Sequence, residues 1–168
     1  MPIITLTTDL GTVDHYVSAV KATIIRQLEN VNIIDISHDI PTFNIIDAAF
    51  VLKNVYQEFP PGTIHIIGVN TETNKNCSHL IVYANEHYFI GSDNGIFSLI
   101  LDLKPDKIFE VITTSDSDNE NFPIKDIFAK SACHIARGGT LEIIGTEIKQ
   151  FSKEFAKLEA LHKKNSIK

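Results

Sequence analysis

The chain has 168 residues, of which 43% are hydrophobic and 21% are charged, and its net charge is −6, as expected for one globular domain with a sizeable core. The 15 lysines and arginines are scattered apart from a small cluster at the end, which disfavours a nucleic-acid-binding face. No apolar stretch is long enough to span a bilayer, so no membrane partner is predicted. The start lacks the charged region and cleavage site of a signal peptide, and two cysteines do not make a disulfide framework. We therefore expect a cytoplasmic protein.

The first 69 residues alternate between strand and helix patterns. Strands are predicted at residues 2–8, 31–37 and 63–69, and helices at residues 14–28 and 44–56. Apolar residues at steps of three and four indicate the helices, and short apolar runs indicate the strands. A β-α-β-α-β order is typical of a parallel sheet covered by helices. We predict a single-domain α/β fold in which a mostly parallel sheet is sandwiched between helices.

The next predicted elements are shorter. Apolar runs at residues 80–84 and 88–91 flank Asn85 and Glu86, which predicts a β-hairpin. A helix is predicted at residues 96–103 and a further strand at residues 108–113.

The last third of the chain begins with a polar, acidic stretch at residues 113–121 that is predicted to be a loop. A helix is predicted at residues 126–137, ending at Gly138 and Gly139 in the manner of a glycine C-cap. After residue 149, Phe151, Phe155 and Leu158 recur at helical spacing, which predicts a final helix.

Polar side chains gather where the first three predicted strands end. In a parallel sheet these ends share one edge, which is where ligands bind in open α/β folds. The segment GSDNG at residues 91–95 is a candidate fourth loop at that edge. A purely structural interpretation also stands, in which Asp14 caps a helix and Gly11 serves a turn. The polar residues at the strand ends are Thr8, Asp9, Gly11 and Asp14, then Ser37, His38 and Asp39, then Asn70, Thr71 and Glu72.

A carboxylate at a strand end, such as that of Asp9, can bind a metal, act as a base or accept hydrogen bonds from the two hydroxyls of a ribose. The sequence TDLGTVD is not the G-x-G-x-x-G fingerprint and no P-loop motif occurs, which disfavours a site for nucleotide phosphates. No H-x-x-x-H or C-x-x-C spacing is present, so no metal is predicted. A nucleoside without phosphates fits the pattern. Asp9 precedes the helix cap, so we expect it to serve ligand binding and to contribute little to stability.

The other candidate catalytic side chains are interpreted as structural. His65 alternates with apolar neighbours in a strand and is predicted to pack in the core. His79 and His87 flank the hairpin and are predicted to be solvated. Cys133 and His134 are adjacent on a helix and point in different directions, which favours a core cysteine beside a surface histidine over a catalytic pair.

Four stretches resemble, in the same order, the S-adenosylmethionine hydroxide adenosyltransferases, which are adenosine-forming hydrolases related to the fluorinase and chlorinase. The resemblance implies that residues 1–168 form the N-terminal α/β domain of this family. It implies a second, β-barrel domain that is absent from these residues. Where that domain is present, it implies a homotrimer with substrate between the first domain of one subunit and the second domain of its neighbour. The stretches are ITLTTDLGTVDHYVSAVKA, VNIIDISHDIPTFNIIDAAFVLKNVYQEFPPGTIHIIGV, HYFIGSDNGIFSLI and IFAKSACHIARGG.

The resemblance also assigns ligand contacts to particular residues. Asp9 matches the carboxylate that holds the ribose diol, and Asp14 matches an acid near the methionine end of the substrate. Phe43 occupies the place of an aromatic residue that lines the sugar pocket, and Asn70 stands where the family has an Asp after the third strand. The implied small-molecule partner is S-adenosylmethionine, as substrate or ligand, or adenosine, and no cofactor is implied.

Three positions depart from the family pattern for water activation, which combines an Asp, an Arg and a His. The family reads Asp-Pro-Gly-Val-Gly after the third strand, with an Arg seven residues beyond the Asp, and His-Gly-Arg-Asp before a later helix. This chain has Asn70, Cys77 and Pro123 at those positions, so its catalytic residues are not assigned. Candidate substitutes are Glu72, Lys75 and Lys125.

The sequence leaves open whether the chain is an enzyme. One hypothesis is a domain that binds S-adenosylmethionine or adenosine. A second is an active S-adenosylmethionine hydrolase with a rearranged water site, since sulfonium is a good leaving group and positioning alone can support a slow reaction. A third is a catalytically inactive ligand-binding or structural family member. Halogenation is the least favoured activity, because no halide pocket is identifiable in the sequence.

Overall fold

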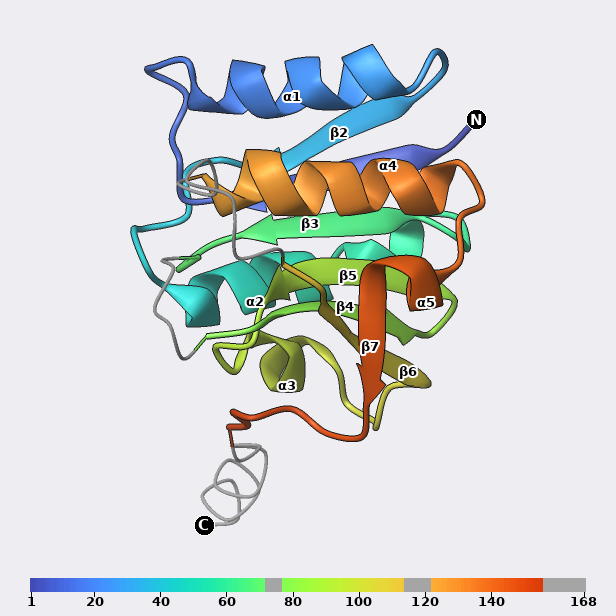
Figure 1. The fold of residues 1–168 in the computed structure, drawn as a ribbon. Coiled ribbons are helices and arrows are strands. Elements are labelled where there is room, and N and C mark those ends of the chain that lie inside the picture. Colours follow the sequence, from blue (N-terminus) through green and yellow to red (C-terminus); the bar gives the residue numbers. More distant parts are fainter. Residues whose placement is uncertain (72–76, 114–121, 156–168) are drawn as a thin grey trace, which may run out of the picture.

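A seven-stranded sheet with the order β2-β1-β3-β5-β4-β6-β7 forms the centre of the computed structural model, which describes residues 1–71, 77–113 and 122–155 (Figure 1). The first four strands in this order run parallel, and β4, β6 and β7 continue the sheet with antiparallel pairings. The predicted α/β fold is confirmed, with a sheet that is mostly rather than wholly parallel. The strands are β1 (Ile3–Thr8), β2 (Asn32–Ser37), β3 (Ile64–Gly68), β4 (His79–Ala84), β5 (His87–Ser92), β6 (Lys107–Val111) and β7 (Gly145–Ile148).

Helices cover both faces of the sheet, and each face has its own apolar core. On one face, α1 and α4 pack over Ile4, Leu6 and Ile66. On the other face, α2 and α3 pack over Ile67 and Phe89. The helices are α1 (Tyr16–Gln27), α2 (Ile45–Lys53), α3 (Ile96–Ile100), α4 (Lys130–Ala136) and α5 (Leu141–Ile144), with the 3-10 helix η1 (Tyr56–Glu58) and the π-helix η2 (Ile124–Ala129).

Local turn and cap chemistry explains several of the element boundaries. The predicted hairpin is confirmed as β4 and β5, and its turn residues Asn85 and Glu86 both have left-handed backbone angles, with φ of 51° and 65°. Helix α2 begins after Asn44, whose side chain accepts a hydrogen bond from the N–H of Asp47 at 3.0 Å. The helix predicted from Asp126 begins two residues earlier, because η2 continues directly into α4.

The prediction of a helix from residue 149 is wrong for residues 149–155, which contain no helix, and Leu158 lies outside the described residues. Phe151 stacks on Phe97 with ring centroids 5.5 Å apart, and Ser98 Oγ accepts a hydrogen bond from the N–H of Phe155 at 2.9 Å. These contacts fix the segment across α3 without a helix. Two elements were not predicted, α5 and β7, because four residues are too few to display a period.

The buried histidines differ in part from expectation. His65 is fully buried, as predicted, with Nδ1 2.7 Å from Thr5 Oγ1 and Nε2 3.1 Å from His87 Nδ1. His79 and His87 are also buried, at 6% and 4% exposure, so the prediction that they are solvated is wrong. The rings of His87 and Tyr56 meet edge to face, which places a polar residue beside the hairpin turn in an aromatic environment.

Cys133 is buried in the core and His134 is half-buried, with Nε2 2.8 Å from the Thr140 carbonyl oxygen. The predicted core cysteine is confirmed, and the histidine predicted for the surface is half-buried. No helix within residues 1–71, 77–113 and 122–155 is long and apolar enough to cross a membrane.

Burial of His65 should make the stability of the fold sensitive to acid. Burial, with a smaller contribution from His87, lowers the pKa of His65 from 6.5 to about 3. Between these values the unfolded chain binds a proton that the folded chain does not, so the free energy of unfolding should fall as the pH drops from 6.5 towards 3. Denaturant titrations across this range should show a loss on the order of a few kcal/mol.

The variant His65→Gln should reduce this pH dependence, whatever its stability at pH 7. The matched control is His134→Gln, which removes a histidine from the periphery of α4. Its stability should depend on pH as strongly as that of the unmodified chain. Equal slopes for His65→Gln and the unmodified chain between pH 6.5 and 4 would contradict the assignment to His65.

Candidate functional site

The carboxylate of Asp9 lies directly after β1 and joins two other loops of the sheet edge. Its Oδ2 accepts a hydrogen bond from the N–H of Phe43 at 3.0 Å and another from the N–H of Asn70 at 3.3 Å. Phe43 precedes α2, and Asn70 follows β3. Three of the four predicted ligand-binding residues therefore meet at one oxygen atom.

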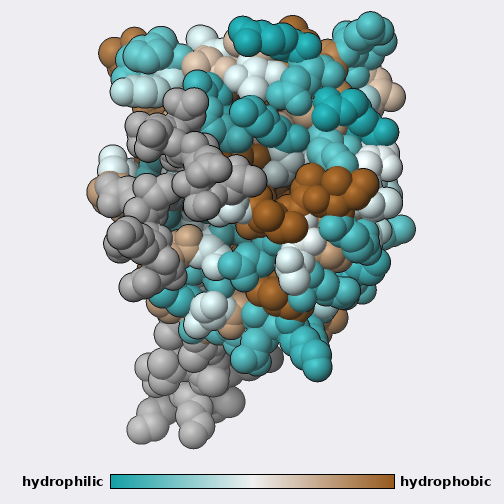
Figure 2. Space-filling view, in the orientation of Figure 1, coloured by the Kyte–Doolittle hydropathy of each residue, from teal (hydrophilic) through white to brown (hydrophobic). Residues whose placement is uncertain are grey.

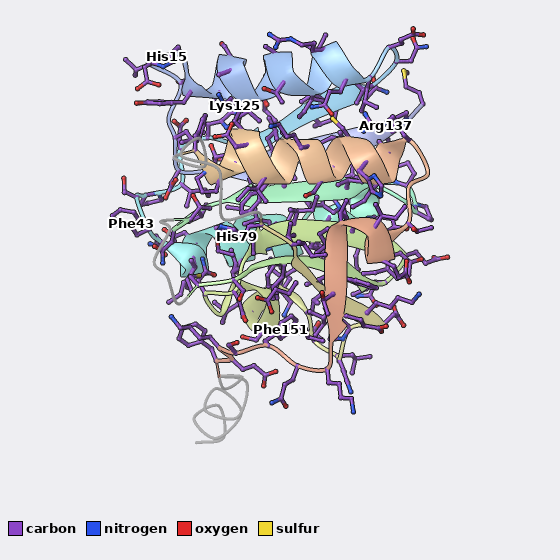
Figure 3. All side chains as sticks on the ribbon, viewed as in Figure 1. His15, Phe43, His79, Lys125, Arg137 and Phe151 are labelled. Carbon is purple, nitrogen blue, oxygen red and sulfur yellow. The ribbon has the colours of Figure 1, made fainter. Side chains whose placement is uncertain are left out.

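Both residues that donate to Asp9 have unusual backbones. Phe43 has φ of 63° and Asn70 has φ of 52°, in the left-handed region that non-glycine residues seldom adopt. Such conformations cost free energy and persist where the surroundings enforce them, which is common at functional sites. The Phe43 side chain is 51% exposed and lies at the edge towards which the arrowhead of β3 points (Figure 3).

The GSDNG segment joins the same edge, as the sequence predicts. The Asn94 amide Nδ2 donates to the carbonyl oxygens of Val69 and Asn70, each at 3.2 Å, and its Oδ1 accepts from the N–H of Ile96. Asn94 is buried, at 8% exposure. The loop after β5 is therefore hydrogen-bonded to the loop after β3. The carbonyl oxygen of Asn70 accepts from Asn94, and its N–H donates to Asp9.

Asp14 lies apart from this set of contacts. It is exposed in the loop before α1, and its Oδ1 accepts a hydrogen bond from the N–H of Tyr16 at 3.3 Å. Among the described residues no hydrogen bond joins Asp14 to Asp9, Phe43 or Asn70. Its neighbour His15 lies at the same side of the molecule as Phe43 (Figure 3). The structural alternative from the sequence, that Asp14 is the N-cap, is not what the structure shows, because the N-cap of α1 is His15 and Asp14 precedes it.

Cys77 and Pro123, which stand at two of the positions that depart from the family pattern, carry no charge at pH 7. Burial raises the pKa of the Cys77 thiol, which favours its neutral form at pH 7. Pro123 is buried and directly precedes η2, where it offers no N–H. The Nζ of Lys125 is 3.5 Å from Oδ1 of Asp126. Glu72 and Lys75 lie outside the described residues.

Helix η2 approaches the end of β3 closely. A Cβ atom on Gly68 would lie 2.5 Å from Cδ1 of Ile124 and 3.1 Å from Cγ2 of Thr8. A larger residue at this point would therefore require the end of the Ile124 side chain to move. π-Helical turns are frequent at functional sites, and η2 begins directly beside the edge that carries Asp9.

Two cavities within the described residues are lined by residues other than Asp9, Phe43 and Asn70. One of about 520 Å³ lies between α3, β6 and the segment at residues 149–155. A second, of about 370 Å³, lies beside α5, where apolar side chains gather on the surface (Figure 2) and Ile143 is 70% exposed. Among the described residues, no group of three or more His, Cys, Asp or Glu side chains could hold a metal ion.

Sequence comparisons connect this chain to a protein family and to relatives named for an enzymatic activity. Residues 4–145 match the model of the SAM hydroxide adenosyltransferase N-terminal domain. A protein named (R)-S-adenosyl-L-methionine hydrolase from Methanocaldococcus jannaschii is 33% identical over 135 residues, which cover 77% of this chain and 51% of that protein. A protein of the same name from Thermus thermophilus is 24% identical over 151 residues, which cover 83% and 59%.

Solved structures share the fold. An uncharacterized conserved protein from Thermotoga maritima superposes with a TM-score of 0.83 at 28% identity, covering 92% of this chain and 61% of its own. A conserved hypothetical protein from Thermus thermophilus gives a TM-score of 0.75 at 25% identity, covering 89% and 59%. The chain thus spans about half to three fifths of the length of the relatives it matches.

The contacts of Asp9 change the expectation that it contributes little to stability. Asp9→Ala removes the acceptor for two backbone N–H groups that hold left-handed residues, and should lower the free energy of unfolding by about 1–2 kcal/mol. Asp9→Asn retains an oxygen acceptor and should cost less than half as much. Denaturant unfolding of both variants measures the difference.

The control is Asp39→Ala, which removes an exposed carboxylate that follows β2 and should change stability by less than about 0.5 kcal/mol. If Asp9→Ala is as stable as Asp39→Ala, the two hydrogen bonds to Asp9 do not contribute to folding.

Proposed function

Because the chain belongs to the S-adenosylmethionine hydroxide adenosyltransferase family, we propose that it binds S-adenosylmethionine or adenosine at the carboxyl edge of β1, β3 and β5. The observation that carries this proposal is the convergence of Phe43 and Asn70 on Oδ2 of Asp9. The other carboxylate oxygen, Oδ1, has no hydrogen-bond partner among the described residues. A free carboxylate oxygen on a rigid support is what a ribose diol requires.

The proposed binding mode uses each residue for one part of the ligand. Asp9 accepts hydrogen bonds from the ribose hydroxyls, and the exposed ring of Phe43 packs against the sugar. Asn70 presents its side-chain amide beside the same atoms. Asp14, exposed at the start of α1, attracts the cationic methionine end of S-adenosylmethionine. These roles follow the resemblance and agree with the chemistry of the side chains.

The reaction of the family would break the bond between the ribose carbon and the sulfonium sulfur. Water forms a new bond to that carbon, the sulfur keeps the electron pair as methionine leaves, and a proton is released. The positions that activate water hold an uncharged amide, a thiol whose pKa burial raises, and a proline. We therefore propose binding without efficient turnover, and keep an active hydrolase with a rearranged water site as the alternative.

The outer side of the ligand would need a cover. The Phe43 side chain is half exposed, and solvent weakens the electrostatic interactions of an open site. We propose that a second domain of a neighbouring subunit in a homotrimer supplies this cover where such a domain is present. The matched relatives are longer than this chain, which leaves room for such a domain in them.

Nucleoside binding should depend on the ribose diol. In calorimetric titrations of the unmodified chain, adenosine should bind about tenfold more tightly than 2′-deoxyadenosine, because one hydrogen bond to a charged acceptor is lost with the hydroxyl. For Asp9→Asn, both ligands should bind weakly and the preference should largely disappear. Asp39→Ala, the control at the same edge, should bind like the unmodified chain.

If the unmodified chain binds adenosine and 2′-deoxyadenosine equally, Asp9 does not hold the diol. If it binds neither adenosine nor S-adenosylmethionine at millimolar concentration, the proposed ligand class is wrong.

Adenosine release from S-adenosylmethionine should be slow or absent. Liquid chromatography of the reaction should show turnover far below about 1 per second, the low end of ordinary enzyme rates. Restoring the family residues together, as Asn70→Asp, Cys77→Arg and Pro123→His, should raise the rate in a chain that carries a second domain.

The matched comparison is the same chain with a second domain and no substitutions, which separates the contribution of the cover from that of the three residues. Turnover near 1 per second in the unmodified chain would favour the alternative, an active hydrolase with a rearranged water site.

A further inference from the structure

Two threonines of β1 each contact a buried histidine in the same way. Thr5 Oγ1 lies 2.7 Å from Nδ1 of His65, and Thr8 Oγ1 lies 2.7 Å from Nδ1 of His38. The first pair lies in the middle of the sheet. The second lies at its carboxyl edge, directly before Asp9. His38 is 6% exposed, so a buried imidazole supports the edge from the side of β2.

The charges around His38 indicate which of its ring nitrogens carries the proton. Its Nε2 lies 2.9 Å from Oδ1 of Asp35, a contact at ion-pair distance that is not aligned as a hydrogen bond, and Lys21 Nζ lies 2.5 Å from Oδ2 of the same carboxylate. Burial alone would raise the pKa of Asp35, but the contacts with Lys21 and His38 outweigh it, and the pKa lies below its usual value.

An ionised Asp35 favours a proton on Nε2 of His38. In the neutral imidazole Nδ1 is then the acceptor, and the hydroxyl of Thr8 donates to it.

Thr8 and His38 together hold the turn that follows Asp9. With its proton committed to His38, Thr8 Oγ1 accepts a hydrogen bond from the N–H of Leu10 at 3.3 Å. The carbonyl oxygen of His38 accepts from the N–H of Gly11 at 2.8 Å, and Gly11 has φ of +72°. Two of the three residues from Asp9 to Gly11 are therefore attached to His38, one through Thr8 and one directly.

We propose that His38 is a positioning residue for the Asp9 carboxylate, acting through the Thr8 hydroxyl and the Asp9–Gly11 turn. The inference rests on the proposed function only in that Asp9 holds the ligand. His38 itself touches neither the ligand nor the reacting atoms. Its contribution is to aim the free oxygen of Asp9 at the ribose, in the way that outer hydrogen bonds fix the orientation of a binding group.

The matched pair of threonines provides the test. Thr8→Val and Thr5→Val each remove one hydroxyl from β1 and leave one buried histidine nitrogen without its partner. Both should lower stability by similar amounts. Only Thr8→Val should accelerate hydrogen exchange at the Leu10 and Gly11 amides, measured by NMR, and only Thr8→Val should weaken adenosine binding, by about three- to tenfold.

Substitutions of His38 add a rescue. His38→Asn retains an acceptor near the position of Nδ1 and should keep the exchange rates and the adenosine affinity within about twofold of the unmodified chain. His38→Leu has no acceptor and should behave like Thr8→Val. Nitrogen-15 NMR of the unmodified chain should find the His38 proton on Nε2.

Three results would overturn the inference. They are equal effects of Thr5→Val and Thr8→Val on the Leu10 and Gly11 amides, equal effects of His38→Asn and His38→Leu, and a His38 proton on Nδ1. Absence of any adenosine binding by the unmodified chain would instead refute the proposed function, and the exchange and tautomer measurements would still decide the role of His38.

Discussion

The arrangement of the candidate site depends on one carboxylate oxygen that holds two backbone segments in left-handed conformations. Oδ2 of Asp9 accepts hydrogen bonds from the N–H groups of Phe43 and Asn70. These residues follow β2 and β3, the two strands that flank β1 in the sheet. A single acceptor that serves two strained residues couples them, because neither loop can relax without losing its bond. The same residue is thus a structural centre and a candidate ligand group, and the two roles use different oxygens of one carboxylate.

The parts of the fold with strong periodicity could be predicted from the sequence, and so could the edge at which Asp9 and Asn70 meet. Predictions failed where tertiary contacts replaced a local pattern. The spacing of Phe151 and Phe155 is helical, but Phe151 stacks on Phe97 and the N–H of Phe155 bonds Ser98, so no helix forms. His87 resembles a solvated turn residue by sequence, but Tyr56 and His65 bury it. The role of Asp9 in holding the backbone has no sequence pattern, because it depends on φ angles that only the folded loops reveal.

A chain of contacts connects a surface ion pair, Lys21 and Asp35, to the buried residues His38 and Thr8, which precede the Asp9–Gly11 turn. Lys21 and Asp35 are partly exposed, at 32% and 40%, while His38 and Thr8 are buried. A surface ion pair contributes little to stability by itself. In our proposal it has a further consequence, because the ionised carboxylate favours one tautomer of a buried histidine and thereby the direction of the bond to Thr8.

The residue at position 70 bears on both ligand binding and catalysis in the proposed site. Asparagine adopts left-handed backbone angles more readily than most residues, which suits the φ of 52° at this position. Its N–H still donates to Asp9, and its carbonyl oxygen still accepts from Asn94. What an amide does not supply is negative charge, and the resemblance drawn from the sequence places this position in the set expected to activate water. An amide at this position is therefore compatible with the backbone contacts that shape the edge, and its lack of charge is one reason why we propose a domain that binds the nucleoside without efficient turnover.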